Sequence, residues 1–257
     1  MNNSISPVFR HTQRHSRGFT MVELMIAVTV TLFLIGGALT MLQSTRKTFA
    51  AQTQLAQLQD NERLVMTFMA AVIESAGYTP SPQNWKNTTV LPISGTTFAT
   101  AGQGVFGTYS AAAPGDTVTI RYGALQNDNI FNCAGTQNTA ANPYDVFVNK
   151  FWVDSVTDPA NPILKCTFTP TSTNIAKTVP LVNGVKMLTI LYGVKRGTVN
   201  TLSCADTYLN ANQMLAADWM EVCSVSIDVT FVNPLLTTST IRVKRVVAVM
   251  NWAGVNT

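Results

Sequence analysis

The sequence predicts an α+β fold in which a long N-terminal helix packs on an antiparallel β-sheet. Three observations lead to this prediction. The stretch from Leu24 to Leu42 carries no charged side chain and is long enough to cross a membrane as a helix. Residues 58–76 place apolar side chains at helical spacing. Beyond residue 115, several runs alternate apolar and polar residues, as half-buried strands do.

The first 18 residues form a basic tip. They contain three arginines and no acid, and so contribute +3 of the net charge of +4. Because basic residues precede the apolar run, we expect the tip to stay in the cytoplasm and the rest to be exported. An ordinary secretory signal peptide is the alternative. Such a peptide has a shorter apolar region and ends at a small-residue cleavage site, whereas here helical sequence follows the apolar run.

The histidines limit the chemistry that the body can perform. Both of them, His11 and His15, lie in the tip, so removing the tip leaves no histidine. That excludes a Ser-His-Asp triad and a His-ligated metal from the remaining chain. The near-neutral body gives no electrostatic reason to expect nucleic-acid binding. The aspartates show no pairing pattern that would indicate a carboxylate enzyme, and we expect neither a cofactor nor a metal. The aspartates considered are Asp116, Asp145, Asp154, Asp158, Asp206 and Asp218.

Glu23 is the only ionisable side chain between Arg17 and Arg46. A carboxylate inside a membrane helix costs a few kcal/mol and is usually functional or partnered. Close to the end of the helix it could also reach the membrane surface, which would need no partner. The sequence around Glu23 favours the partnered interpretation.

The string "RGFTMVEL", residues 17–24, resembles at every position the class III signal of type IV pilins and type II secretion pseudopilins. The resemblance implies that a prepilin peptidase cuts after Gly18 and methylates the new N-terminal amine of Phe19. It also implies that Glu23 pairs with the N-terminal ammonium of a neighbouring subunit. A low-dielectric environment strengthens such a pair and penalises subunits that dock out of register.

The helix should run from Phe19 to Ala76, since Gly77 and the prolines after it are stop signals. Its second half carries the apolar stripe Leu58, Val65, Phe68, Met69, Val72, Ile73 and Ala76. Residues 80–115 are rich in small and polar residues and predict a long irregular segment. Strands are then predicted in "DTVTIRYGA", "YDVFVNKFWVD", "LKCTFT", "SVSIDVTFV" and "TIRVKRVVAVMNW", and a break at Arg245 could interrupt the last of them. The alternation predicts a sheet with one face in water and the other covered by the apolar stripe.

The chain has four cysteines, none of them in a CxxC motif: Cys133, Cys166, Cys204 and Cys223. An even number in an exported body favours disulfides. Three connectivities are open, and we prefer pairing in chain order, Cys133 with Cys166 and Cys204 with Cys223. Closing the shorter loop would stabilise the fold by about 3 kcal/mol. Buried free thiols are the alternative.

Four further blocks narrow the resemblance. "LQDNERLVMTFMAAVIESAGY", "DTVTIRYG", "LVNGVKMLTILYGV" and "DWMEVCSVSIDVTF" are similar, in the same order, to blocks of PilW-type minor pilins. The family implies the type IV pilin fold, in which a long helix with a transmembrane first half packs on an antiparallel head. Four regions are then expected: a leader at 1–18, a transmembrane and assembly half of the helix at 19–45, an amphipathic half at 46–77 and a β-rich periplasmic head at 78–257.

The resemblance implies a structural protein and not an enzyme. A minor pilin of this type would prime type IV pilus assembly, support twitching motility and form part of the tip complex. Its expected partners are other minor pilins, the major pilin, a tip adhesin-like protein, the prepilin peptidase and the inner-membrane assembly platform. It would cross the inner membrane once, with a cytoplasmic N-terminus and a periplasmic head, and then reach the pilus tip at the cell surface.

Two other functions stay open. One is a J-type minor pseudopilin of a type II secretion system. The other is a membrane-tethered module that binds a surface ligand, for which Trp85, Trp152, Trp219 and Trp252 could line a sugar site. Single tryptophans in β-rich domains more often serve packing.

Overall fold

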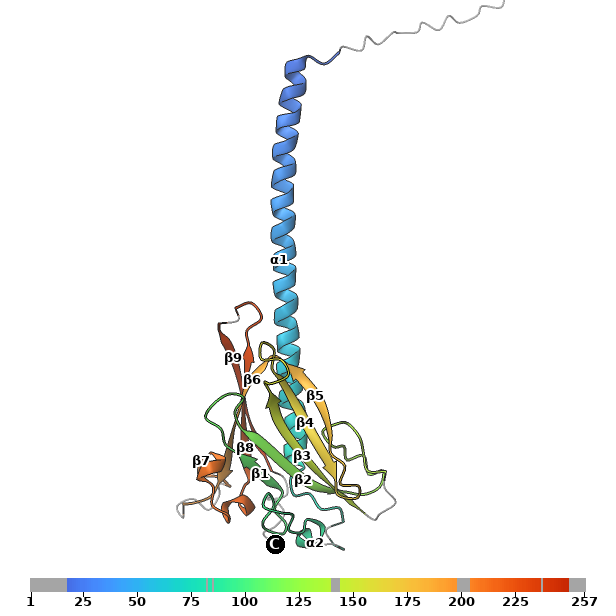
Figure 1. The fold of residues 1–257 in the computed structure, drawn as a ribbon, viewed down its shortest axis with the longest axis vertical. Helices are drawn as coiled ribbons and strands as arrows, with labels where there is room; N and C mark the ends of the chain where they lie inside the picture. Colours follow the sequence, from blue (N-terminus) through green and yellow to red (C-terminus); the bar gives the residue numbers. More distant parts are fainter. Residues whose placement is uncertain are drawn as a thin grey trace, which may run out of the picture. The chain divides into compact units, whose positions relative to one another are not determined.

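A computed structural model describes residues 18–81, 83–84, 86–139, 144–197, 204–236 and 238–249 (Figure 1). By its internal contacts the chain divides into two compact units, Met1–Thr53 and Gln54–Thr257. The helices are α1 (Met21–Glu74), α2 (Asn87–Val90) and the short 3-10 turns Ala211–Gln213 and Asp218–Met220. The strands are β1 (Val105–Thr108), β2 (Thr117–Ala124), β3 (Asp145–Asp154), β4 (Ile163–Pro170), β5 (Lys177–Asn183), β6 (Val185–Val194), β7 (Thr207–Leu209), β8 (Ser224–Val232) and β9 (Thr240–Ala248). The predicted α+β class, with a long N-terminal apolar helix and antiparallel sheets, is confirmed.

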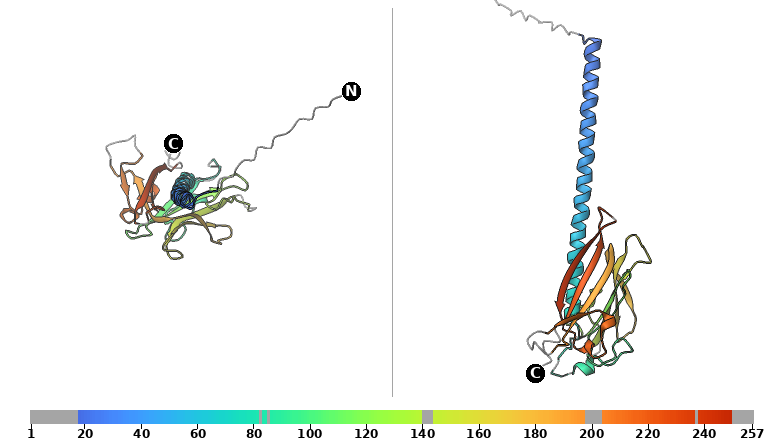
Figure 2. Two further views of the ribbon diagram at one scale, coloured as in Figure 1. Left: turned by 90° about the horizontal axis from the view of Figure 1, so that it is seen from above. Right: turned by 90° about the vertical axis from the view of Figure 1, so that its left-hand side faces the viewer.

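The strands form two antiparallel sheets. One has the order β1-β2-β3-β4-β5 and the other β7-β6-β8-β9. Strands that follow one another in the chain pair by hairpins within the first sheet, whereas β6 and β8 pair across the excursion that holds β7. In the second unit, β8 and β9 run alongside the C-terminal part of α1 (Figure 2).

The C-terminal part of α1 supplies one side of a core shared with both sheets. Its buried residues are Leu58, Val65, Met66, Met69, Ala70, Val72, Ile73 and Ala76. Phe68 is partly buried against the same cluster. These residues include the whole apolar stripe that the sequence predicted. The helical spacing of the stripe therefore places it on the covered face of the helix.

The end of the helix requires two glycines. Gly77 follows the last turn with φ of 73°, a left-handed conformation that glycine adopts without strain, and its N–H donates to the Arg121 carbonyl at 2.9 Å. The backbone of Gly104 lies so close to Gly77 that a Cβ at position 104 would collide with the Gly77 backbone. This close approach joins the helix end to the segment that precedes β1.

Strand β8 shows how far the alternation prediction holds. Val225, Ile227, Val229 and Phe231 have no exposed surface and face the core, as predicted. On the opposite face, Ser224 and Ser226 are also buried, so the prediction that this face lies in water was wrong for its first half. The Ser224 hydroxyl lies 3.1 Å from the Tyr208 hydroxyl of β7, and this tyrosine covers that end of the face.

A buried aspartate links the two sheets. The carboxylate of Asp116, just before β2, accepts hydrogen bonds from the Ser110 N–H at 2.9 Å and from the Ile190 N–H of β6 at 2.7 Å. The Asp116 N–H donates to the Leu188 carbonyl at 2.7 Å. This aspartate therefore has a structural use that its position in the sequence does not reveal.

Two further sequence predictions need correction. Residues 80–115 are not irregular throughout, because they contain α2 and β1, and the buried Arg121 side chain binds carbonyl groups of this segment. Strand β9 is not broken at Arg245, which pairs with Ile227 in an uninterrupted ladder. The long Arg245 side chain reaches away from the sheet and donates to the Met66 carbonyl at 3.5 Å. The charged group is thus accommodated without a break in the strand.

Two disulfides connect the four cysteines in the order that we preferred. Cys133 pairs with Cys166, with their Cα atoms 6.2 Å apart, and Cys204 pairs with Cys223, with their Cα atoms 5.9 Å apart. The first bond ties the loop between β2 and β3 to β4. The second ties the segment before β7 to the residue before β8.

Replacing Cys133 and Cys166 together by alanine should lower the free energy of unfolding by about 3 to 4 kcal/mol, because the bond closes a long loop in the unfolded chain. Urea unfolding of the full chain in detergent, followed by circular dichroism, measures this loss. The Cys204–Cys223 bond closes a shorter loop. The Cys204→Ala/Cys223→Ala variant should therefore lose slightly less free energy of unfolding. Equal stability of the first variant and the native chain would contradict the expectation.

The Asp154 carboxylate should make stability depend on acidity. Its pKa is held well below the usual range, first by the Lys165 ammonium at 2.6 Å, and further by the Thr157 hydroxyl and the N–H groups of Val156 and Thr157. A lowered pKa in the folded state stabilises the fold above the ordinary aspartate pKa of about 3.9, and this contribution is lost as the pH falls. The stability difference between the native chain and Asp154→Asn should therefore shrink between about pH 5 and pH 2. Urea unfolding at each pH tests this, and a difference that does not change with pH would contradict it.

Candidate functional site

The start of α1 is built around Thr20. Its hydroxyl oxygen accepts the Glu23 N–H at 3.3 Å, and its carbonyl accepts the Leu24 N–H at 3.2 Å. Thr20 is thus the N-cap residue, and Thr-x-x-Glu is the pattern of a capping box. This role of Thr20 was not predicted, although the spacing of Thr20 and Glu23 in "RGFTMVEL" is a sufficient signal. The cap fixes where the helix begins, two residues after Phe19.

The three predicted residues lie at this helix start. Gly18 and Phe19 precede the first turn, and the Phe19 side chain is 76% exposed. Glu23 is an exposed residue of the first turn. Among the residues that the structure describes, none donates a hydrogen bond to the Glu23 carboxylate. The predicted leader at 1–18 lies outside the described residues apart from Gly18 itself.

The N-terminal part of α1 is apolar on every side and exposed. Its large apolar residues at least 47% exposed are Met21, Val22, Leu24, Met25, Ile26, Val28, Val30, Leu32, Phe33, Leu34, Ile35, Leu39, Met41 and Leu42. Within the described ranges, α1 is the one helix that is long and apolar enough to cross a membrane, judged by length and composition. A helix that is apolar all round belongs in lipid or among other apolar helices.

The threonine hydroxyls of this segment are compatible with an apolar environment. The Thr31 hydroxyl donates to the Ala27 carbonyl at 2.7 Å and the Thr40 hydroxyl to the Gly37 carbonyl at 2.7 Å. The Thr29 hydroxyl lies 2.9 Å from the Ile26 carbonyl. Because each hydroxyl is satisfied within its own helix, it brings no unmet hydrogen bond into hydrocarbon.

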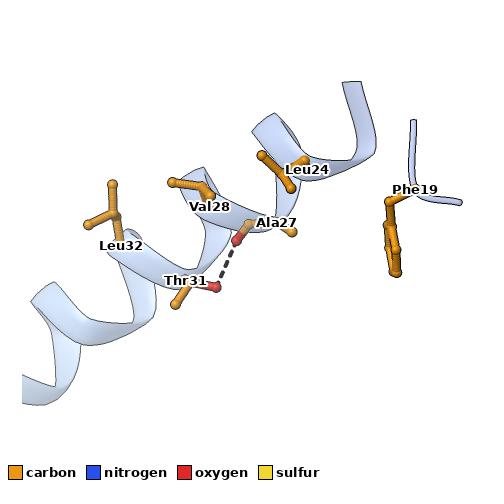
Figure 3. A pocket seen from close by; sticks show the side chains of 6 residues that line it. All are labelled: Phe19, Leu24, Ala27, Val28, Thr31 and Leu32. Atoms are coloured by element: carbon orange, nitrogen blue, oxygen red, sulfur yellow. Dashed lines mark hydrogen bonds between the residues drawn. The ribbon is translucent and has the colours of Figure 1, made fainter. Parts of the chain in front are cut away.

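An apolar groove of about 410 Å³ lies at the helix start (Figure 3). It is lined by Phe19, Leu24, Ala27, Val28, Thr31 and Leu32. Figure 3 shows Phe19 beyond the first turn, with Leu24, Val28 and Leu32 following one another along the helix. The small residues Ala27 and Thr31 are four positions apart, the spacing that lets helices approach closely in membranes.

In the head, the described tryptophans that were considered for a sugar site make packing contacts. Trp219 packs against Phe106 and Tyr192, with ring centroids 5.1 and 4.9 Å apart, and the Trp152 indole N–H donates to the Thr167 hydroxyl at 3.1 Å. Trp85 and Trp252 lie outside the described residues. These contacts support the packing role for Trp152 and Trp219.

The aspartates likewise serve the backbone. Asp145 accepts the N–H groups of Val146 and Ser172, Asp158 that of Ala160, and Asp206 those of Arg196 and Gly197. Asp218 forms an ion pair with Arg196, which holds the pKa of this aspartate below its usual value. In the described part of the chain, no group of three or more histidine, cysteine or acidic side chains could hold a metal ion.

Comparison with known families gives two matches. The prokaryotic N-terminal methylation motif matches residues 13–39, which include Gly18, Phe19 and Glu23. The family described as type IV pilus-assembly protein W matches residues 150–245, from within β3 to within β9. Both matches fit a PilW-type, prepilin-like minor pilin. No curated protein matches the chain.

The two matches agree with the arrangement of the described residues. The methylation motif covers the cap, the groove and the greater part of the apolar stretch, and together with the apolar helix it supports a membrane-anchored pilin. The PilW match covers six of the nine strands over all or most of their length, including the whole second sheet apart from the end of β9. Both matched families are structural components of pili, which associate with other pilus components.

Proposed function

We propose that this minor pilin primes type IV pilus assembly and forms part of the tip complex together with other minor pilins. The observation that supports the proposal best is the helix start. There a capped helix presents Phe19 and a Glu23 carboxylate that has no partner among the described residues, at the end of an apolar surface. A carboxylate held in hydrocarbon there would be stabilised by a cation from another molecule.

In this proposal the prepilin peptidase cuts after Gly18 and methylates Phe19. Residues 19–45 remain as the transmembrane and assembly half of the helix, residues 46–77 form its amphipathic half, and residues 78–257 form the periplasmic head. Glu23 then pairs with the N-terminal ammonium of a neighbouring subunit. The leader faces the cytoplasm while the chain is in the inner membrane, and the assembled protein reaches the pilus tip with the major pilin and a tip adhesin-like protein.

Mass spectrometry of the membrane-extracted protein should show a chain that begins at N-methylated Phe19. The expectation rests on the position of the apolar helix, since a cut before it leaves the helix attached to the head. A mature N-terminus near residue 45 would show that the helix is removed and would contradict the proposal.

Chemical cross-linking in cells, followed by a pull-down of the tagged full chain, identifies the assembly. Recovery of other minor pilins and of the pilus assembly platform supports the tip-complex role. Recovery of secretion pseudopilins in their place would assign the chain to a type II secretion pseudopilus, which would contradict the pilus role while leaving the processing step intact.

A further inference from the structure

A cleft of about 660 Å³ opens in the head between the loop of residues 131–139 and the adjoining ends of β3 and β4. We propose that this cleft binds a short neutral oligosaccharide. Its volume lies within the range of small-molecule sites in proteins. The cleft lies wholly within the second unit and involves none of the residues of the helix start. The proposed ligand site can therefore be tested independently of the role in pilus assembly.

The charges in the cleft favour a neutral ligand. Asp145 is the one ionisable residue among those that line it, and Asp145 is 3% exposed. Its carboxylate already accepts hydrogen bonds from the N–H groups of Val146 and Ser172 at 2.8 and 3.0 Å, and from the hydroxyls of Thr171 and Ser172 at 2.9 and 2.5 Å. With these donors in place the carboxylate needs no cation, and among the described residues no lysine, arginine or histidine lines the cleft to attract an anion.

The remaining lining combines apolar rings with amide and hydroxyl groups. Phe147 and Phe168 are buried, whereas the Phe131 side chain is 52% exposed and free to contact a ligand. The Oε1 atom of Gln137 is shut off from solvent and accepts no hydrogen bond from the residues that the structure describes. An unmet buried acceptor is costly until a donor reaches it, so in this proposal the terminal amide rotates to accept a hydrogen bond from a ligand hydroxyl. Sugar rings present C–H faces to aromatic rings and hydroxyls to amides, so they match both parts of this lining.

A peptide fits the cleft less well. Extended peptides are usually recognised when they add a strand to an open sheet edge. Strands β3 and β4 are both interior, because β2 and β5 flank them in the five-stranded sheet. Their main-chain groups are already paired and cannot bind a peptide backbone. Recognition here must come from side chains, as it does for a sugar.

The wall of the cleft is held in place before any ligand arrives. The disulfide Cys133–Cys166 ties the loop to β4, and the Cys133 N–H donates to the Asn149 side chain at 2.9 Å. The Tyr122 hydroxyl donates to the Phe131 carbonyl at 2.7 Å, and the Asn132 side chain donates to the Thr136 hydroxyl at 2.7 Å. Because this wall is already ordered, a ligand loses little binding free energy in ordering it.

Saturation-transfer NMR on the full chain tests the proposal. The protein is held in a phosphocholine detergent, since maltoside headgroups would themselves be sugars. The probes are cellobiose, N,N′-diacetylchitobiose and, as an acidic sugar, 3′-sialyllactose. We expect signal transfer to at least one neutral disaccharide. Comparing cellobiose with N,N′-diacetylchitobiose shows whether the cleft recognises hydroxyl or acetamido groups.

Two variants distinguish binding from folding. Phe131→Ala removes the exposed ring, and Gln137→Leu replaces the amide by an apolar group of similar size. Each should weaken the affinity for the neutral sugar at least about tenfold. Gln137→Leu should keep or raise the Tm, because it removes a buried unmet acceptor. Val156→Ala is the matched control, since Val156 is 87% exposed and does not line the cleft.

The absence of transfer to both neutral sugars would overturn the proposal, as would unchanged affinity in Phe131→Ala and Gln137→Leu. Transfer to 3′-sialyllactose alone, or binding of unglycosylated peptides in place of sugars, would also overturn it.

Discussion

Replacing Glu23 by glutamine should reduce incorporation of the protein into complexes with other minor pilins at least about tenfold. The change keeps the size of the side chain and removes its charge. Because the flanking helix surface is apolar and exposed on every side, we expect Glu23 to sit in hydrocarbon, where an ammonium partner is worth more than in water. The variant would leave that ammonium without its counterion, and breaking one side of a buried ion pair costs about 3–5 kcal/mol. Co-purification of the tagged chain with its cross-linked partners measures the effect.

The control for this experiment is Asp60→Asn. Asp60 is an exposed carboxylate of the same helix, outside the apolar stretch, so its loss should leave incorporation unchanged. The N-terminus of each variant is checked by mass spectrometry, so that failed processing is not mistaken for failed docking. Glu23→Asp keeps the charge on a shorter side chain and should retain part of the incorporation. Normal incorporation of a correctly processed Glu23→Gln variant would remove the proposed role of Glu23.

Replacing Arg121 by methionine should lower the free energy of unfolding by about 3 kcal/mol or more. Arg121 is 2% exposed, and its guanidinium donates to four carbonyls. These belong to Gln103 and Pro92, each at 2.6 Å, and to Leu91 and Thr100, each at 3.3 Å. The Phe98 ring lies on the guanidinium, with its centroid 4.2 Å from Cζ. Methionine fills a similar space but removes the guanidinium donor of the Gln103 and Pro92 carbonyls. The Leu91 and Thr100 carbonyls keep the N–H groups of Gly102 and Gln103 as donors.

Burial lowers the pKa of Arg121 to about 10, so the group is still charged at neutral pH. Its charge is offset by carbonyl dipoles and the aromatic ring, which a planar guanidinium can contact together. Arg121→Lys should therefore also be destabilising, because an ammonium cannot reach all four carbonyls. Urea unfolding measures both variants, with the exposed Arg63→Met as the control. A loss no larger than that of the control would show that Arg121 does not hold the segment before β1.

Local pattern was enough to predict several elements. The apolar stretch and the stripe from Leu58 to Ala76 predicted one long helix, and the structure gives α1 from Met21 to Glu74. The alternation around Val225 and Ile227 predicted the buried face of β8. In each case the signal is a period of the helix or strand itself, so it is present in neighbouring residues and requires no knowledge of the partner element.

The errors occurred where distant residues decide the outcome. Residues 80–115 read as irregular because their small and polar composition carries no period, yet carbonyl groups at 91, 92, 100 and 103 converge on the Arg121 guanidinium. Ser224 was assigned to a wet face because sequence alternation cannot show that Tyr208 covers it. The cleft beside Phe131 depends on a disulfide between residues 33 positions apart.

The sequence by itself determined the processing motif, the apolar helix and its Glu23, and the class of fold, because each depends on residue types within a few turns or strands. Only the tertiary structure decided that the head has two sheets linked through Asp116, that Arg121 orders the segment before β1, and that a cleft lies beside β3 and β4. Buried polar groups must find partners wherever the chain brings them. Those partners lie far away in the sequence, and the fold alone places them within hydrogen-bonding distance.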